Sequence, residues 1–176
     1  ELLKRFDMEK CAPLRTPMVE RLSESNRGAP LSKEEQARYR EMVGSLLYLA
    51  CWSRPDISFA VSELSRFVAC PGGVHDKAAK RVLRYLQGTR DLGLRCVAPN
   101  DSPKNRLWGC VDSDWAGCVS TRKSISGCAL FILGVNVCGI SRTQQTIALS
   151  SGEAELYAIG LGVSESLFVR TLLLES

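Results

Sequence analysis

The stretch GCALFILGVNVCGIS, residues 127–141, predicts two β-strands that are joined by a tight turn. The strands are Gly127–Leu133 and Val135–Ser141, and Gly134 marks the turn between them. Because the turn is short, the two strands are expected to pair as a β-hairpin.

A third strand and a helix flank this hairpin. The strand is predicted over Leu107–Asp112. The helix is predicted from Ser150, whose hydroxyl can cap its first turn while Glu153 completes a capping box. Three strands followed by a helix predict the start of an α+β or mixed α/β unit, not a complete sheet with both faces covered.

Helical periodicity dominates the first half of the chain. One helix is predicted to begin at Ser32, with a capping box to Glu35, and to end before Arg54-Pro55-Asp56. A second is predicted from Ile57 through Val68, and a third from Asp76 to Gln87. The residues before the first helix hold three prolines, which predicts a short helix or strand end and then an extended connector.

The composition is that of an ordinary globular protein. Among 176 residues, 45% are hydrophobic and 24% charged, which excludes a disordered polyelectrolyte and a collagen-like repeat. The net charge is +4 and it is unevenly distributed. Residues 1–97 hold 17 Lys and Arg against 12 Asp and Glu, whereas the remainder holds 6 against 7. This basic first half suits a nucleic-acid partner without requiring one.

The cysteines indicate the redox compartment of the protein, and the length of the apolar runs indicates whether the chain can cross a membrane. The eight cysteines include no C-x-x-C pair and the chain has one histidine, so we expect buried thiols in a reducing compartment rather than a zinc site or disulfides. No secretory signal opens the sequence. The near-apolar run Leu46–Trp52 is shorter than the roughly 18 residues of a membrane span. Because no Met begins the chain, we expect a piece of a longer protein.

The third predicted helix carries a basic face. Its apolar residues lie on one side, and four cations spaced i, i+3, i+4 and i+7 lie on the other: Lys77, Lys80, Arg81 and Arg84. One interpretation is a solvated face over a buried stripe. The other is a row of contacts to the phosphate backbone of a nucleic-acid duplex.

Four carboxylates form the most informative cluster for chemistry. Asp112 and Asp114 stand at the end of a predicted strand, and Glu153 and Glu155 in the first turns of the last helix. Carboxylate oxygens are the ligands that Mg²⁺ prefers, and phosphodiester hydrolysis commonly uses two such ions. The alternative is that the aspartates form a turn and the glutamates complement the helix dipole.

Two other kinds of site fit the residues less well. A calcium loop of the EF-hand type fails because Ala116 and Lys123 occupy positions that need ligands. His75, the single histidine, stands in the helical half, where a helix start or a core contact explains it better than a general base does.

Several motifs, in order along the chain, resemble copia-type LTR retrotransposon polyproteins. The matching stretches are YREMVGSLLYLA (39–50), SRPDISFAV (53–61), LSRF (64–67), HDKAAKRVLRYLQGT (75–89), SDWAG (113–117), SISG (124–127) and ALSSGEAE (148–155). Together they cover nearly the whole chain, so the resemblance is specific although each motif alone is weak.

The resemblance implies three regions. Residues 1–36 resemble the end of the reverse transcriptase core with a linker, and residues 37–97 its helical thumb and connection region. Residues 104–176 resemble the N-terminal, truncated part of a ribonuclease H-like domain. In this family the thumb grips the template–primer duplex, which favours nucleic-acid binding by Lys77, Lys80, Arg81 and Arg84.

The resemblance also implies a catalytic site. Asp112 resembles the first catalytic aspartate and Glu155 the catalytic glutamate, both of which bind Mg²⁺ in the family, with two ions in the complete domain. Asp114 is not among the matched ligands, and Glu153 is interpreted as a capping residue. The third and fourth acids would lie beyond Ser176, so we expect this fragment alone to be nearly inactive.

The expected function is therefore that of a reverse transcriptase and ribonuclease H polyprotein segment, an endonuclease that cuts the RNA strand of RNA–DNA hybrids. Its expected partners are that hybrid, the template–primer duplex and the rest of the Pol polyprotein, with no membrane. The expected location is intracellular, in a cytoplasmic virus-like particle or the nucleus. The alternative is a non-catalytic nucleic-acid-binding or structural remnant of a decayed element.

Overall fold

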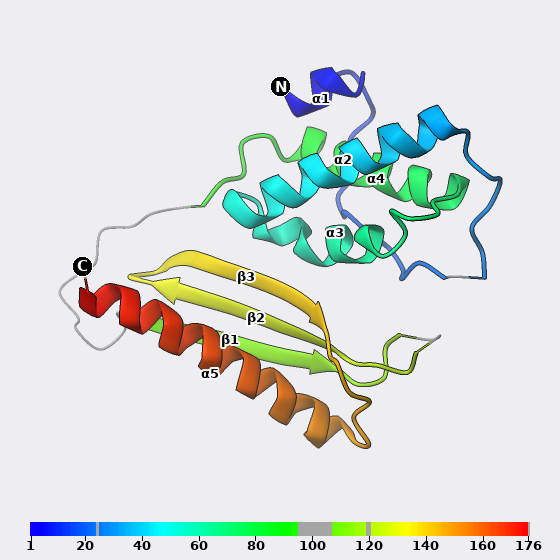
Figure 1. Ribbon diagram of the computed structural model, residues 1–176. Coiled ribbons are helices and arrows are strands. Elements are labelled where there is room, and N and C mark those ends of the chain that lie inside the picture. Colours follow the sequence, from blue (N-terminus) through cyan, green and yellow to red (C-terminus); the bar gives the residue numbers. More distant parts are fainter. Residues whose placement is uncertain (24, 95–106, 119–120, 176) are drawn as a thin grey trace. The chain divides into compact units, whose positions relative to one another are not determined.

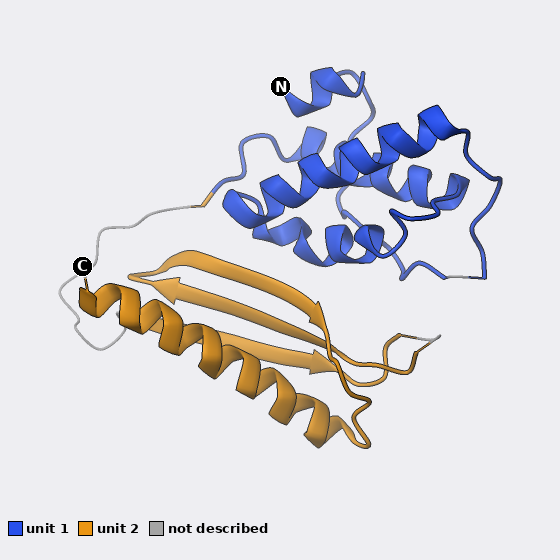
Figure 2. Ribbon diagram, viewed as in Figure 1, with its two compact units in different colours: residues 1–93 blue, residues 94–176 orange. Residues whose placement is uncertain are grey.

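The computed structural model describes residues 1–23, 25–94, 107–118 and 121–175. They form two compact units, residues 1–93 and 94–176, each with its own secondary structure (Figure 2). The expected boundary between residues 97 and 104 lies outside the described residues. The chain is mixed α/β, as predicted.

Unit 1 is helical. Its elements are α1 (Leu2–Arg5), α2 (Lys33–Trp52), the 3₁₀ turn η1 (Pro55–Ile57), α3 (Ser58–Ser65) and α4 (Gly73–Gly88) (Figure 1). The predicted capping box of α2 is confirmed. Ser32 Oγ accepts from the Glu35 N–H at 3.2 Å, and Glu35 Oε2 accepts from the Ser32 N–H at 2.8 Å.

Two predicted helix boundaries are wrong. The second helix ends at Ser65 rather than Val68, because the Phe67 and Val68 N–H groups bond three residues back and form tight turns. The third begins at Gly73 rather than Asp76. The extra turn forms because His75 Nδ1 accepts from the Gly72 N–H at 2.9 Å, which satisfies a donor at the helix start.

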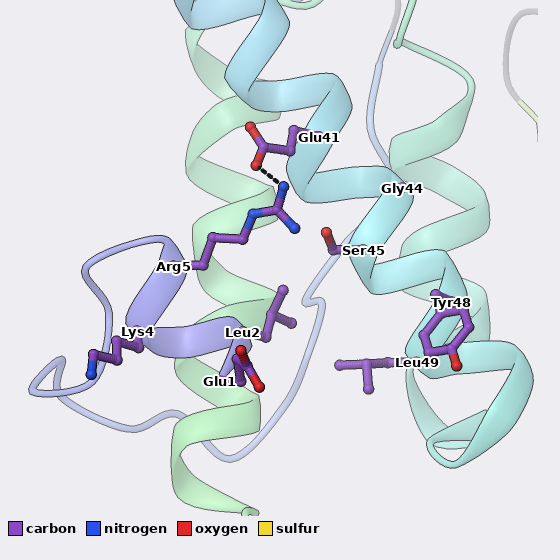
Figure 3. A pocket seen from close by; sticks show the side chains of 9 residues that line it. All are labelled: Glu1, Leu2, Lys4, Arg5, Glu41, Gly44, Ser45, Tyr48 and Leu49. Atoms are coloured by element: carbon purple, nitrogen blue, oxygen red, sulfur yellow. Dashed lines mark ion pairs between the residues drawn. The ribbon is translucent and has the colours of Figure 1, made fainter.

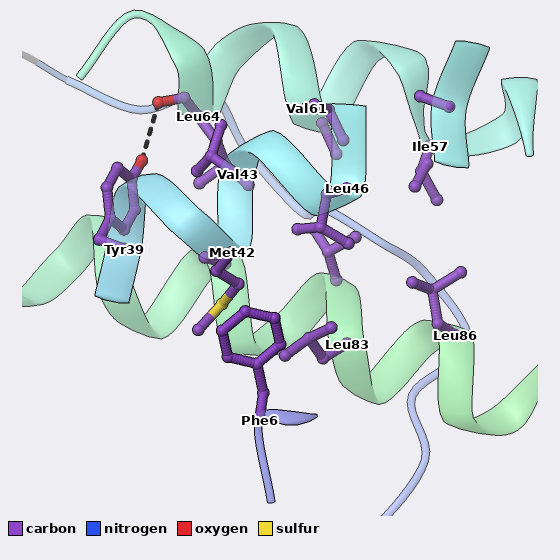
Figure 4. Packing of buried hydrophobic residues seen from close by; sticks show 14 residues of the cluster. Phe6, Tyr39, Met42, Val43, Leu46, Ile57, Val61, Leu64, Leu83 and Leu86 are labelled. Carbon is purple, nitrogen blue, oxygen red and sulfur yellow. Dashed lines mark hydrogen bonds between the residues drawn. The ribbon is translucent and has the colours of Figure 1, made fainter. Parts of the chain in front are cut away.

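The core of unit 1 lies among α2, α3 and α4, and Phe6 reaches it from beyond α1 (Figure 4). Tyr39 is fully buried, and its hydroxyl donates to the Leu64 carbonyl at 2.7 Å, so its polar tip is satisfied inside an apolar cluster. The largest aliphatic side chains buried with it are Met42, Leu46, Ile57, Leu64 and Leu83.

A buried arginine links the end of α2 to the end of α4. The guanidinium of Arg54 donates to both carboxylate oxygens of Asp56, at 2.9 and 2.7 Å, and to the carbonyl and hydroxyl oxygens of Thr89, at 2.9 and 2.7 Å. Tyr85 donates to Asp56 at 2.8 Å. Burial alone would raise the pKa of Asp56, but the donors Arg54 and Tyr85 lower it. The segment Arg54-Pro55-Asp56, here called the RPD segment, thus holds the end of α2 and the end of α4 together.

Replacing Arg54 by Met should lower the free energy of unfolding by about 2–4 kcal/mol, because Asp56 and Thr89 lose their charged donor. The matched control is Arg38→Met, which breaks the exposed pair with Asp7 and should cost under about 1 kcal/mol. Urea unfolding of the whole chain followed by circular dichroism measures both. If the two variants lose the same unfolding free energy, Arg54 does not hold α2 and α4 together.

His75 is buried and neutral. Its ring stacks on Phe67 with centroids 4.0 Å apart, and its Nδ1 accepts a hydrogen bond from Gly72, so Nδ1 carries no proton. Burial, and secondarily the charge of Arg27, lower the pKa of His75 below its ordinary value of 6.5. The interpretation of His75 as a helix-start and core residue agrees with this geometry.

His75 should make unfolding easier in mild acid. Because the unfolded chain protonates this imidazole more readily than the folded chain does, stability is lost as pH falls below about 6.5, by at most about 1.4 kcal/mol per pH unit. Above that pH the effect is absent. His75→Gln keeps a capping acceptor without titrating, so its urea midpoint should fall less between pH 6.5 and 5. Identical pH profiles would refute this assignment.

Unit 2 is an antiparallel sheet with one long helix. The strands β1 (Leu107–Asp114), β2 (Ile125–Ile132) and β3 (Val135–Thr143) pair in chain order, and α5 (Ser151–Glu175) packs against β1 and β2 (Figure 1). The predicted hairpin is confirmed, and Gly134 at its turn has a φ of +82°.

Close packing places α5 on the sheet. A Cβ atom on Gly162 would lie 2.3 Å from Val111 Cγ1, so only glycine allows the helix to approach β1 this closely. Ala154 and Ala158 are also fully buried on that side of α5. Small residues one or two turns apart therefore form the contact face of the helix.

One sequence expectation needs correction here. Of the described cysteines only Cys118 and Cys128 are buried, while Cys51, Cys70 and Cys110 are exposed. Among the described helices, α5 is long and apolar enough to cross a membrane by length and composition alone. Its packing on β1 and β2 also explains part of that apolar character.

Candidate functional site

Asp112 lies within β1, not at its end. The strand continues to Asp114, because Asp114 Oδ1 accepts from the Ile125 N–H at 2.6 Å and extends the pairing with β2. Asp112 pairs with Gly127 and is exposed. Since Val111 contacts α5 and side chains alternate along a strand, Asp112 is on the face of β1 away from the helix.

The neighbouring acids have structural partners. Asp114 supports the start of β2, as described above. Glu153 Oε2 accepts from the Leu149 N–H at 2.7 Å, and the Glu153 N–H donates to Ser150 Oγ at 3.1 Å. The interpretation of Glu153 as a capping residue therefore agrees with the structure, although its carboxylate reaches Leu149 rather than Ser150.

Asp112 and Glu155 differ from these neighbours. In the described part of the chain, no hydrogen bond or ion pair engages either carboxylate. Asp112 is exposed and Glu155 half-buried in the second turn of α5. Neither turn formation nor helix capping therefore accounts for these two acids.

A buried glutamine joins the two elements that carry them. Gln144 Nε2 lies 2.9 Å from the Ala154 carbonyl oxygen, the residue before Glu155, and 3.1 Å from Ser113 Oγ, the residue after Asp112. Sequence reasoning missed Gln144. The sequence pattern does not indicate that Gln144 is buried while the neighbouring Gln145 is exposed.

The two acids alone do not make a complete metal site. Within the described ranges, no cluster of three or more His, Cys, Asp or Glu side chains could hold an ion. Carboxylates suit Mg²⁺, but a pair of ions needs more ligands than Asp112 and Glu155 supply. Further ligands would have to come from outside these residues.

Half of the predicted basic face of α4 is engaged within unit 1. Residues 9–16, here called the strap, run along the helix. Arg84 Nε donates to the Ala12 carbonyl at 2.7 Å, and Arg81 donates to Thr16 Oγ1 at 2.9 Å. The strap also bonds to α4 through its backbone, since the Leu14 N–H donates to the Arg84 carbonyl at 3.2 Å.

The other two cations are on the surface. Lys77 is exposed, and Lys80 is exposed with an ion pair to Asp76 at 2.7 Å. These two lysines remain available to an outside partner, whereas Arg81 and Arg84 are half-buried and hold the strap.

Two hollows, one in each unit, are not lined by the predicted acids. One of about 950 Å³ lies between α1 and α2, where Arg5 pairs with Glu41 and Tyr48 lines the hollow further along α2 (Figure 3). Another, of about 320 Å³, runs along β1 and α5 and is lined mainly by apolar residues such as Val111 and Leu130. Neither hollow is lined by Asp112 or Glu155, and in the first Glu41 is paired with Arg5.

These features define a class of protein: a mixed α/β chain whose helical segment and following three-stranded sheet with one helix are consistent with a partial ribonuclease H-like fold. Comparison with known proteins gives the family. The chain is 36% identical to the "Retrovirus-related Pol polyprotein from transposon TNT 1-94" of Nicotiana tabacum, over 99% of this chain and 13% of that protein. The transposon RE1 polyprotein of Arabidopsis thaliana is also 36% identical, over 99% of this chain and 12% of its own length.

A shorter relative is "Secreted RxLR effector protein 161" of Plasmopara viticola, 40% identical over 74% of this chain and 90% of that protein. Over nearly its whole length the chain is homologous to retrovirus-related Pol polyproteins from plant transposons. It spans about one eighth of the length of the polyproteins it matches. No family model and no solved structure matches it.

Proposed function

We propose that this chain is the reverse transcriptase–ribonuclease H segment of a copia-type Pol polyprotein. In the full-length protein, Asp112 and Glu155 would be two of the carboxylates that hold two Mg²⁺ ions for cutting the RNA strand of RNA–DNA hybrids. The ordered motifs and the polyprotein relatives support this proposal.

One observation carries the catalytic assignment. Four acids cluster in the sequence, and the two that the resemblance does not select, Asp114 and Glu153, have structural hydrogen bonds. The two that it selects, Asp112 and Glu155, have none in the described residues. Two acids without a structural partner are available to bind a metal ion.

The substrate and setting follow from the same proposal. The RNA–DNA hybrid and the template–primer duplex would contact unit 1 through Lys77 and Lys80, and the remainder of the polyprotein would supply the missing ligands. An enzyme of this kind would act inside the cell, in a cytoplasmic virus-like particle or the nucleus.

The catalytic assignment is tested in a chain extended past Ser176. With Mg²⁺, such a chain should cut the RNA of a labelled hybrid, and Asp112→Asn or Glu155→Gln should lower the rate by about 100-fold or more, because each loses a charged metal ligand. Gel analysis of the cleaved RNA measures the rate.

Asp114→Asn and Glu153→Gln are the matched controls. Each removes the same charge, but an amide oxygen still accepts the hydrogen bond from Ile125 or Leu149, so both controls should cut within about threefold of the parent rate. If the controls lose as much activity as Asp112→Asn and Glu155→Gln, the assignment of the two sites is wrong.

A second candidate is a non-catalytic nucleic-acid-binding or structural remnant. The Plasmopara viticola relative favours it, since most of that protein corresponds to this segment without a complete polyprotein around it. A parent chain, extended as above, that binds duplex without cutting hybrid would support this candidate.

Duplex binding should depend on the two exposed lysines. Lys77→Gln with Lys80→Gln should weaken binding to an RNA–DNA hybrid at low salt and reduce the slope of log K against log salt by about 1–2. Lys33→Gln with Arg38→Gln removes the same charge from exposed positions of α2 and should change the slope little. Fluorescence anisotropy over a salt series measures both. Equal slopes for the two double variants would show that Lys77 and Lys80 make no specific contact.

A further inference from the structure

Gln144 is the buried polar residue at the junction of the sheet and α5. It follows β3 directly and is 8% exposed, while Gln145 beside it is exposed. Its N–H donates to the Ser124 carbonyl at 2.8 Å, which fixes the backbone beside the start of β2. The side chain is therefore directed inward by a backbone that is itself held in place.

The amide of Gln144 contacts three elements. Its Nε2 lies 2.9 Å from the Ala154 carbonyl oxygen on α5, 2.9 Å from Ser126 Oγ on β2 and 3.1 Å from Ser113 Oγ on β1. A carbonyl oxygen only accepts, so the nitrogen must face Ala154, and this contact fixes the orientation of the amide. Methionine or leucine could fill the space but not donate.

Two of the residues that Gln144 contacts are sequence neighbours of Asp112 and Glu155, the two acids without a structural partner. Ser113 is the residue after Asp112, and Ala154 is the residue before Glu155. A shift of β1 relative to the first turns of α5 would move Ser113 Oγ or the Ala154 carbonyl oxygen away from Nε2, which shares two hydrogens among three acceptors. In this buried setting a lost contact leaves polar atoms without partners. The side chain thus limits how far the two acids can move relative to one another.

We propose that Gln144 is a positioning residue: its amide holds the strand that carries Asp112 against the helix turn that carries Glu155. The inference rests on the proposed function for its catalytic meaning, but the mechanical link itself concerns only residues of this chain. Gln144 acts through Ser113 and Ala154 and touches neither acid.

Asn136 provides a matched control, because its side-chain amide also bridges two groups but lies away from the junction with α5. Asn136 Nδ2 also bridges two carbonyl oxygens, those of Leu130 and Cys138, both at 3.3 Å, near the β2–β3 turn. Removing it should weaken the sheet without loosening the junction with α5. Gln145→Met controls for loss of a neighbouring exposed amide.

The mechanical link is measured by hydrogen–deuterium exchange on the 176-residue chain. Gln144→Met and the isosteric Gln144→Glu should speed exchange by about tenfold in both segments 111–115 and 152–157, because the two segments lose a shared anchor. Asn136→Leu should speed exchange around the β2–β3 turn instead, and Gln145→Met should match the parent chain. If the Gln144 variants speed exchange in only one segment, or no more than Asn136→Leu does there, the link is overturned.

The catalytic meaning is measured as hybrid cleavage by the chain extended past Ser176. Gln144→Met and Gln144→Glu should lower kcat by about tenfold or more and change KM by less than about threefold, since duplex binding is assigned to unit 1. Asn136→Leu should retain kcat at a temperature where it is folded. Normal kcat in the Gln144 variants would refute the positioning role while leaving the proposed function intact. An inactive parent chain would instead refute the proposed function, and the exchange result would still decide the link.

Discussion

The register between β1 and β2 determines the arrangement of unit 2. Pairing Asp112 with Gly127 and Asp114 with Ile125 directs Val111 and Ser113 toward α5 and Asp112 to the opposite face. A slip of one residue would exchange the two faces, place a carboxylate under the helix and expose the valine that meets Gly162. The short bond from Ile125 to Asp114 secures this register at the end of the strand where the acids lie.

Each unit has a buried polar side chain that joins elements that are distant in sequence. In unit 1 the guanidinium of Arg54 joins the turn after α2 to Thr89 at the end of α4. In unit 2 the amide of Gln144 joins β1, β2 and α5. Such contacts favour one arrangement over others, because a buried donor that misses its acceptor is costly. They also explain why the RPD segment needs an arginine and an acid rather than any helix-ending sequence.

The sequence predicted the elements that depend on local chemistry. The Ser32–Glu35 capping box, the proline that ends α2 and the glycine hairpin at Gly134 each act within a few residues, and all are present. Features that depend on distant partners could not be predicted. The sequence places Arg81 and Arg84 on the same basic face as Lys77 and Lys80. In the structure, however, residues of the strap accept hydrogen bonds from both arginines. Likewise, Gln144 and Gln145 are equivalent in the sequence, and only the approach of α5 separates them.

The strap has a consequence for work with parts of this protein. Arg81 and Arg84 are half-buried and donate hydrogen bonds to residues 9–16, which lie along α4. A peptide of α4, or a chain shortened from its N-terminus, would present both arginines to solvent along with the two lysines. Its affinity for any polyanion would then exceed that of the intact unit, so measurements on such a piece would overstate how strongly the protein binds nucleic acid.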